Sequence, residues 1–347
     1  MNERATLPMI DRLRGALADL DPHADAPASL ESLALDGFDR LPLPGSGATL
    51  QRWQALAVVA EHDLSLAKLY EGHTDALAIL SELAPPSDTL PGATWGVWAA
   101  EAPEGRATII TAEGAGQVRL HGSKCWCSGA GSASHALLTA WHPHGCGPQL
   151  VRVAIRQPGV EATAAAWKAV GMAGSASIDV SFHDAPAQTV GGVGDYLSRP
   201  GFWQGGAGVA ACWYGGAVAL AGTLRRSIAR APESWRTGFR FAALGRIDLS
   251  LQGTAAVLRD AAAWIDRHPH EDAATVALRA RLAAEESAMR VLAEAGRALG
   301  AAAFCRDARF ARAAADLPVF IRQSHGDRDF AALGERVMLP GESPWLL

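Results

Sequence analysis

Cysteine is scarce in this sequence and follows no recognisable spacing. The 347 residues include five cysteines: Cys125, Cys127, Cys146, Cys212 and Cys305. Cys125 and Cys127 form C-W-C, which is not a zinc spacing, and neither a second pair nor a histidine cluster completes a metal site. We therefore expect no disulfide framework and no metal, and we expect reduced thiols in a cytoplasmic protein.

Lysine, targeting segments and long apolar runs are also lacking. Lysine occurs only at Lys68, Lys124 and Lys168, and charged residues make up 19% of the chain, with a net charge of -5. This balance gives no indication of nucleic-acid binding. The stretch from Met1 to Leu17 has no apolar signal core. We find no run of about 18 apolar residues without charge, so we expect no transmembrane helix and no membrane partner.

Hydrophobic residues are plentiful instead, at 49% of the chain. That share is ample for a large core, and a chain of 347 residues favours more than one compact unit. Alanine and glycine are abundant, and such small residues permit close helix packing and close approach of the backbone to a ligand. The residue pattern divides the chain into three regions, 1–88, 89–195 and 196–347.

The first two regions differ in periodicity. In 1–88 the apolar residues recur at helical spacing, and the proline-containing stretch at 85–92 ends the helical pattern. In 89–195, short segments such as ATIITA, LVRVAI and SIDVSFHD are β-branched or alternate apolar with polar residues. This middle region predicts an antiparallel β-domain, either a barrel or a sandwich.

The third region is helical again. Segments 203–230, 240–267, 272–300 and 305–322 are long and alanine-rich, with apolar residues at three- and four-residue intervals. Their lengths predict a bundle of four antiparallel helices, with a short last helix after it. The fold class is therefore α+β, with an N-terminal helical domain, a β-domain and a C-terminal bundle.

Two motifs in the middle region resemble the acyl-CoA dehydrogenase family. An acidic-Pro-Gly loop, AEAPEG, precedes a strand of the form G-x-K-x-W-x-[ST]-x-[AG], here GSKCWCSGA. Further on, GMAGSAS resembles the family's G-x-R-x-S-x-[ST], with Ala173 where an arginine is common. The matched positions of the first motif are Glu101, Pro103, Gly105, Gly122, Lys124, Trp126, Ser128 and Gly129.

The resemblance implies a flavin, FAD, bound at the β-domain. Trp126 would flank the flavin ring, and Ser128 would place its hydroxyl near the flavin N5. Glu101, on the acidic-Pro-Gly loop, would be a further cofactor-binding residue. The alternative interpretation makes Trp126 an aromatic residue of the barrel core and Ser128 a polar residue at a strand end. A flavin enzyme must hold the ring and place the substrate against it, and the protein supplies that geometry.

In the bundle, GRALGAAAF at 296–304 resembles the family's Q-x-L-G-G-x-G-F. Gly300 and Phe304 match, whereas Arg297 replaces the glutamine, and Ala301 and Ala303 replace glycines. The resemblance implies that this segment binds the flavin pyrophosphate of a neighbouring subunit, in a homodimer or homotetramer.

An arginine near the start of the second bundle helix would assist in binding the pyrophosphate, and here the candidates are Arg240 and Arg246. Arginine is a fixed planar donor that suits a phosphate. For each of these arginines, including Arg297, the alternative is a solvated helix face.

The catalytic base departs from the family pattern. The tail reads RQSHGDRDFAAL at 322–333, where the family has the form Y-E-G-T-x-[DE]-I. Aligned on Gly326, His325 takes the place of the glutamate and Ser324 that of the tyrosine, with Asp329 at the acidic position. Histidine can act as a base near neutral pH. The alternative is a helix-capping cluster of Ser324 and Asp327.

Two further residues are weaker candidates for the site. His73, in LYEGHTDAL, lies near the expected active-site wall, although a lone helix histidine also fits a packing or surface role. Asp248 is the acid to consider if the base comes from a bundle helix instead.

Three functions remain open on this sequence. The first is a flavin-dependent dehydrogenase that acts on a small substrate such as an acyl-CoA with a base other than glutamate. The second is a flavin-dependent monooxygenase of the same fold, and the third is a flavin-free binding or assembly protein. The histidine at the glutamate position argues against the first in its ordinary form, and the retained G-x-K-x-W-x-S strand argues against the third.

Overall fold

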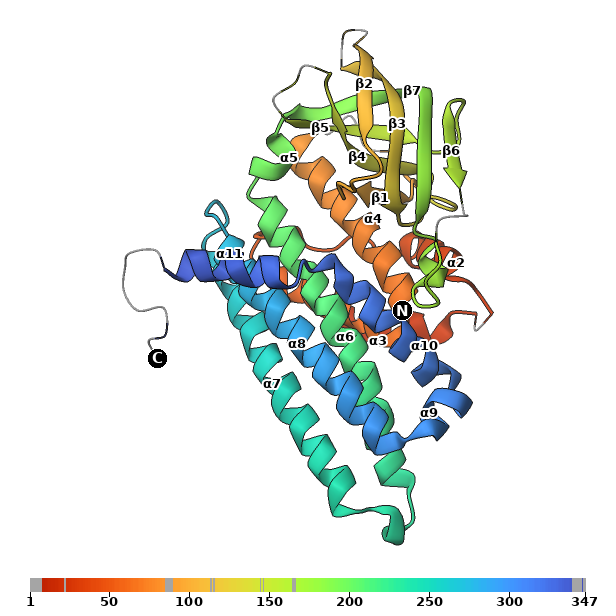
Figure 1. Ribbon diagram of the computed structural model, residues 1–347, viewed down its shortest axis with the longest axis vertical. Coiled ribbons are helices and arrows are strands. Elements are labelled where there is room, and N and C mark those ends of the chain that lie inside the picture. The colour runs from red at the N-terminus through yellow and green to blue at the C-terminus, as the bar shows by residue number, and fades with distance from the viewer. Residues whose placement is uncertain are drawn as a thin grey trace, which may run out of the picture.

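The computed structural model describes residues 8–21, 23–84, 90–112, 114, 116–143, 145, 147–163, 167–338 and 345. Within this part of the chain, a sheet domain lies at one end of a long helical bundle, and the N-terminal helices lie between them (Figure 1). Three groups of buried apolar side chains form the core, a large one among the helices and two smaller ones at the sheet.

Four helices open the chain: α1 (Met9–Asp19), α2 (Ala26–Leu35), α3 (Thr49–His62) and α4 (Leu64–Leu83). Aspartates begin two of them, because the Asp25 side chain accepts from Ala28 N and the Asp63 side chain accepts from Leu66 N. Asp63 is also the last residue of α3, so the chain turns from α3 into α4 within one residue. This junction fixes the position of α4 beneath the sheet.

The strands of the sheet close into a ring. Strands β4 and β2 pair at one residue pair, β2 pairs with β3, β3 with β7, β7 with β5, and β5 returns to β4, while β1 and β6 extend the ring. The strands are β1 (Trp95–Trp98), β2 (Ala107–Ala112), β3 (Gln117–Cys127), β4 (His135–Trp141), β5 (Pro148–Ala154), β6 (Val160–Thr163) and β7 (Ile178–Val193).

The purely antiparallel sheet expected from the sequence is wrong in one respect. Strand β4 runs parallel to both β1 and β2. The chain leaves β1, folds the antiparallel hairpin of β2 and β3, and then returns beside β1 in the original direction. Alternation of apolar and polar residues is the same in both kinds of pairing, so the sequence pattern does not distinguish them.

The helical region after the sheet contains α5 (Asp195–Ser198), α6 (Gly201–Arg230), α7 (Gly238–Arg267), α8 (Ala274–Leu299), α9 (Ala301–Arg306), α10 (Ala308–Phe320) and α11 (Asp327–Val337). The helix expected over 305–322 is split. Asp307 leaves the helical conformation, and its side chain accepts from Phe310 N, so it ends α9 and begins α10.

Helix α6 passes through the middle of the bundle and packs closely on α3. Gly215 lies against the backbone of Ala57, where a Cβ atom would collide with the Ala57 carbonyl oxygen. The stretch from Gly201 to Leu224 carries no charged residue, so the expectation of no such run was wrong. By length and composition α6 could cross a membrane, but 72% of its apolar stretch is buried inside the fold, as in the core helix of a globular bundle.

Candidate functional site

Trp126 occupies a bulge near the end of β3. The register between β3 and β7 shifts between Lys124 and Cys127, and Trp126 has a left-handed backbone with φ of 59°. A bulky residue in this conformation is strained, and bulges commonly re-aim a side chain beside a functional site. The side chain is 55% exposed. Trp126 is therefore not the core aromatic of the alternative interpretation, and its ring is free to receive a flat ligand.

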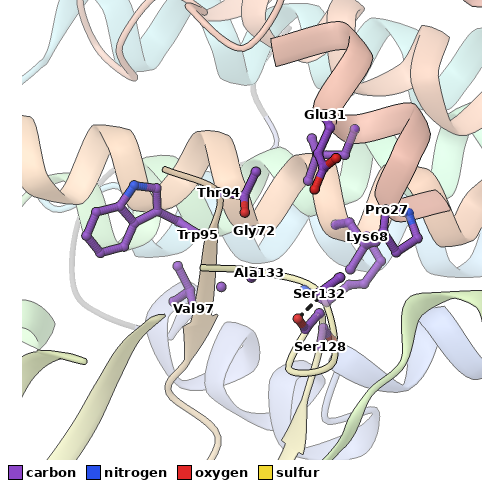
Figure 2. Close-up of a pocket in the computed structure, with 14 residues that line it drawn as sticks. Pro27, Glu31, Lys68, Gly72, Thr94, Trp95, Val97, Ser128, Ser132 and Ala133 are labelled. Carbon is purple, nitrogen blue, oxygen red and sulfur yellow. Dashed lines mark hydrogen bonds between the residues drawn. The ribbon is translucent and has the colours of Figure 1, made fainter. Parts of the chain in front are cut away.

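Ser128 follows the bulge and lines a recess between the sheet and the N-terminal helices (Figure 2). The recess holds about 400 Å³ of atom-free space, part of it open to solvent. Strand β1, helices α2 and α4, and the turn after β3 form its walls. Its polar side chains are those of Glu31, Lys68, Thr94, Ser128 and Ser132, and Lys68 forms an ion pair with Glu71 at 2.7 Å.

Glu101 belongs to a hydrogen-bond network inside the sheet. Its carboxylate receives the Lys124 ammonium at 2.9 Å, the Thr139 hydroxyl at 2.5 Å and the Trp141 indole N–H at 3.1 Å. Partial burial opposes ionisation, but the hydrogen bonds from Thr139 and Lys124 outweigh it and lower the pKa of Glu101. Lys124 is fully buried. These contacts show Glu101 holding its loop to the barrel, whereas the sequence predicted that it binds the cofactor directly.

The tail residues form a small cluster around Asp329. The Ser324 hydroxyl and the His325 backbone N–H donate to Asp329 Oδ2 at 3.4 and 3.2 Å, and His325 Nδ1 lies 3.3 Å from Asp329 Oδ1. The His325 side chain is 64% exposed, whereas that of Asp329 is 13% exposed. A carboxylate on one ring nitrogen orients the imidazole and leaves the other nitrogen open, which suits a base.

The capping interpretation of this cluster is partly right. Gly326 occupies the capping position of α11 and provides no side-chain cap, so Asp327 does not cap the helix as expected. Asp329 instead reaches back from the third helical position to the residue before Gly326. A capping role and a base-orienting role are thus combined in Asp329.

Arg281, which the sequence gave no reason to select, fastens this tail to the bundle. Its guanidinium donates to the carbonyls of Gln323 at 2.8 Å and Gly206 at 3.0 Å, and it lies over the Trp213 ring at 5.2 Å. Burial lowers the pKa of Arg281. Helices α8 and α6 therefore set the position from which Ser324 and His325 project.

His73 has a structural environment. It is 1% exposed, its Nδ1 accepts from Trp95 N at 3.2 Å, and its Nε2 lies 3.3 Å from Asp39 Oδ2. Because Nδ1 accepts, the proton of a neutral ring sits on Nε2 and is shared with Asp39. Both nitrogens are engaged, so the packing role fits His73 better than catalysis. Asp248 is exposed on α7 and is not among the residues that line the recess.

The candidate phosphate-binding residues lie together at the end of the bundle far from the sheet (Figure 1). Arg240, Arg246 and Arg297 line an open recess with about 1320 Å³ of atom-free space, part of it open solvent, and Gly300 follows directly after α8 with φ of 68°. Arg246 and Arg297 each lie 3.4 Å from a carboxylate oxygen of Glu294. Arg240 donates to Ala298 O and to the Ser227 hydroxyl.

The site residues predicted from the sequence are thus not brought together in one place, and Ser324 and His325 line neither of the two recesses. Trp126 and Ser128 lie at the sheet, and the three arginines lie at the distal end of the bundle. Within the part of the chain that the structure describes, no group of three or more His, Cys, Asp or Glu side chains is placed to hold a metal ion.

No family model and no curated protein matches this sequence. Solved structures do match its fold. Dibenzothiophene monooxygenase TdsC from Paenibacillus sp. A11-2 is 17% identical, with 95% of each chain covered and a TM-score of 0.77. Methanesulfinate monooxygenase MsuC from Pseudomonas fluorescens is 18% identical, with 96% of this chain and 97% of that chain covered and a TM-score of 0.73.

Butyryl-CoA dehydrogenase from Megasphaera elsdenii also matches, at 16% identity and a TM-score of 0.77, with 97% of this chain and 99% of that chain covered. At these identities the likeness concerns the fold alone. It confirms the acyl-CoA dehydrogenase-like fold that the motifs indicated, and it shows that flavin monooxygenases and a dehydrogenase both share it.

Proposed function

We propose that this protein is a flavin-dependent monooxygenase that acts on a small organic substrate with reduced flavin and oxygen. The observation that carries the proposal is the pairing of His325 with Asp329, at the tail position where the resemblance expects the glutamate base of a dehydrogenase. TdsC and MsuC, which have the same fold, are monooxygenases by name.

The residues at the sheet fit a flavin ring. Trp126 offers an exposed aromatic face, and Ser128, two residues further along the chain, lines the recess. A bound flavin would supply the redox chemistry, which no side chain provides. The chain's own residues would bind the ring, orient it through Ser128, and hold or move a proton at His325 Nε2.

The kind of flavin depends on the distal arginines. FAD is the expectation from the sequence, and its pyrophosphate would need Arg240, Arg246 and Arg297 from a second copy of the chain, because these residues lie far from Trp126 in one copy. FMN lacks that second half and would need only the sheet site. One structure of TdsC contains FMN, so we propose FMN as the alternative cofactor.

The second candidate function is a dehydrogenase that uses His325 as its base. The His325–Asp329 pairing is compatible with it as well, because an imidazole with one nitrogen held and the other open can accept a proton, and the observation specific to this candidate is the shared fold of a dehydrogenase. Butyryl-CoA dehydrogenase shares the fold. A small substrate and a cytoplasmic location are proposed for both candidates.

The decisive experiment begins with purified protein incubated with FMN and with FAD. For the monooxygenase, we expect oxygen consumption with a flavin reductase and transfer of one oxygen atom to a test substrate, with dibenzothiophene, indole and methanesulfinate as probes. Anaerobic bleaching of the bound flavin by butyryl-CoA would instead establish the dehydrogenase. If the protein bound neither FMN nor FAD in either redox state, both the monooxygenase and the dehydrogenase would be rejected, and a flavin-free protein would be favoured.

A further inference from the structure

A cleft on the side of the bundle lies apart from both recesses described above. It forms where α1, α2, α6 and α10 meet the junction of α3 and α4, and it holds about 1480 Å³ of atom-free space, part of it open solvent. No residue that lines it also lines the recess at the sheet or the recess at the distal end of the bundle. In Figure 1, α2 and α10 lie on the same side of the molecule. We call this hollow the side cleft, and a ligand in it would be separate from the proposed flavin.

Two buried hydroxyls face the side cleft without a hydrogen-bond partner. Ser29 of α2 is 7% exposed and Ser65 of α4 is 4% exposed, and both line the cleft. Among the described residues, neither hydroxyl has a group to which it donates or from which it accepts. A buried polar group without a partner is unfavourable. Since a hydroxyl both donates and accepts, these two side chains suit the hydroxyl groups of a ligand.

Charged side chains of both signs line the rest of the side cleft. Arg14 forms an ion pair with Glu61 at 3.0 Å. Arg312 lies 3.8 Å from Asp63, at the limit of an ion pair. Two of the arginines are therefore matched by carboxylates of the cleft. The charged residues of the lining are Arg14, Arg226, Arg309, Arg312, Asp21, Asp25, Glu61 and Asp63.

Arg226 and Arg309 have no carboxylate within ion-pair distance among the described residues. Arg226 Nη2 donates to the Thr223 hydroxyl of its own helix at 3.1 Å. Arg309 Nη2 donates to the carbonyl oxygens of Glu61 and His62 at 3.1 and 3.5 Å. Nε and Nη1 of each guanidinium donate to no described residue, so they are open to a ligand. A phosphate ester carries roughly −1.5 to −2 charges at pH 7 and accepts paired N–H donors, which fits two such guanidiniums.

The carboxylates determine which other groups the ligand carries. Asp25 and Asp63 cap α2 and α4, so the positive ends of these helices balance part of their charge. Asp21 is exposed, and its side chain accepts from His23 N at 2.9 Å. Carboxylates repel a phosphate but accept from hydroxyl groups. The wall that carries Asp21, Asp25 and Ser29 therefore suits the hydroxyl-bearing part of a ligand, and the wall formed by α6 and α10 suits its phosphate.

We propose that the side cleft binds a small phosphorylated polyol, such as a sugar phosphate. Its phosphate lies on Arg226 and Arg309, and its hydroxyl groups lie on Ser29 and Ser65. Each of these contacts uses donors or hydroxyls that have no partner within the described fold. The proposal does not depend on the flavin site, because the two share no lining residue. The protein would therefore hold two ligands at once.

The test is a set of calorimetric titrations of the purified protein with ribose 5-phosphate, ribose and inorganic phosphate. Ribose 5-phosphate should bind with a dissociation constant below about 1 mM. Ribose and phosphate should each bind at least about 10-fold more weakly, because each lacks one of the two sets of contacts. The same titration in saturating FMN should give the same constant for ribose 5-phosphate.

Two variants locate the bound ligand. Arg226→Gln should weaken both ribose 5-phosphate and inorganic phosphate about 10-fold, and Arg226 bonds only within its own helix, so the fold should remain intact. Ser65→Ala should weaken ribose 5-phosphate about threefold or more and leave inorganic phosphate unchanged, because the hydroxyl contacts the polyol part. Arg225→Gln, at the neighbouring exposed position of α6 outside the cleft lining, is the matched control and should bind as the wild type does. Thermal unfolding without ligand checks that each variant folds.

Three kinds of result would overturn the proposal. Ribose 5-phosphate could fail to bind, or bind no better than inorganic phosphate, and the latter would indicate an adventitious ion only. Loss of ribose 5-phosphate binding in saturating FMN would place the sugar phosphate in the flavin site. Unchanged affinity for ribose 5-phosphate in Arg226→Gln or in Ser65→Ala would mean that the ligand binds elsewhere. None of these results decides the proposed function, which is tested by flavin binding and oxygen transfer.

Discussion

At the scale of single residues, Trp126 combines backbone strain with an exposed ring. Residues in the left-handed region that are neither glycine nor asparagine cost roughly 1–3 kcal/mol and persist only where the surroundings hold them. The Trp126 backbone is held by the bulge in β3 and by its N–H bond to Asp179. An exposed ring gains little from burial, so the strain is consistent with the proposed stacking of a flavin ring on Trp126.

We predict that Trp126→Gly weakens FMN binding by about 10-fold or more while leaving stability unchanged or raised by about 1 kcal/mol, because glycine adopts this backbone without strain. Flavin fluorescence titration and urea unfolding measure the two effects. Asp184→Gly is the matched control, since Asp184 has φ of 55° on an exposed part of β7. If both variants lost flavin affinity equally, the flavin ring would not stack on Trp126.

His325 is the second residue whose role can be tested alone. If it moves a proton in the reaction, His325→Ala should lower turnover about 100-fold or more. Asp329→Asn should lower it less, because it keeps the imidazole and disturbs its orientation and the helix cap. Steady-state rates with the probe substrate that proves active give the measurement, and His270→Ala, at an exposed position after α7, serves as the control. Unchanged turnover in His325→Ala would remove the histidine from the mechanism.

Motif positions let the sequence select Trp126, Ser128 and His325, because each stands in a recognisable local string. The sequence could not select Arg309 as part of the side cleft, nor Arg281 as the anchor of the tail. Their roles arise from contacts between segments about 40 residues or more apart, and a string of neighbours carries no record of such contacts.

At the scale of elements, the ion pair between Glu101 and Lys124 joins a loop to the barrel. We predict that Glu101→Gln lowers the free energy of unfolding by about 1–3 kcal/mol at pH 7, because the buried Lys124 loses its charged acceptor. The folded pKa of Glu101 lies below its ordinary value of 4.5. Its stabilising effect is therefore present above pH 4.5 and is lost as the pH falls through the folded pKa.

Urea unfolding at pH 7 and at successively lower pH checks this prediction. The difference between wild type and Glu101→Gln should shrink on acidification. A difference that stays constant with pH would mean that the charge of Glu101 contributes nothing and that only its shape matters.

Asp316 connects α10 to the strained loop at Met172, where its carboxylate accepts from Met172 N and the Met172 backbone is left-handed, and it has the opposite pH behaviour. Burial raises the pKa of Asp316 above its ordinary value of 3.8. Its stabilising effect is therefore full below pH 3.8 and is lost as the pH rises through the folded pKa, so the charge is a cost at pH 7.

We predict that Asp316→Asn is neutral or stabilising at pH 7, since it keeps an acceptor for Met172 N without the charge. Asp316→Ala should cost about 1–3 kcal/mol, because it leaves that buried N–H unpaired. Thermal unfolding of the two variants distinguishes them. A stability loss of the same size in both would show that the carboxylate charge, and not the acceptor, holds the loop.

Helical periodicity predicted the long helices well, because an apolar stripe at three- and four-residue spacing is specific for an amphipathic helix. It did not show the break at Asp307, since the apolar residues continue in phase across it. Alternation likewise predicted the strands but not the parallel pairing of β4, which depends on the path of the chain between strands.

At the scale of the whole molecule, the two recesses that we propose as parts of one flavin site cannot meet within a single chain. The sheet recess and the arginine recess lie at opposite ends of the fold. Exposed apolar side chains, including Trp235 and Phe239, border the arginine recess. These features support the proposed homo-oligomer, in which the distal end of one copy meets the sheet of another.

We predict that the double variant Arg240→Ala and Arg297→Ala weakens FAD binding about 10-fold and leaves FMN binding within about twofold, because only FAD reaches across to the arginines. Calorimetric titration with each flavin gives the comparison, and Arg267→Ala, at the other end of α7, is the control. If FMN binding weakened as much as FAD binding, the arginines would stabilise the fold and would not bind the pyrophosphate.

The sequence predicted which arginines belong together but not how far they lie from the sheet. It identified the arginines as a set and expected them to serve a neighbouring subunit. The distance between the two recesses depends on how α7 and α8 extend from the sheet, and no local pattern encodes that distance.

The charge-free stretch of α6, Gly201 to Leu224, also affects how the chain folds while it is being synthesised. Its partner α3 precedes it in the chain, but its other large partner, α8, is translated later. While the ribosome has released α6 but not residues 274–299, the nascent chain displays an uncovered apolar helix long enough to resemble a membrane span. During that interval we expect the chain to need chaperones that cover apolar surface, and we expect slower synthesis of α8 to increase aggregation.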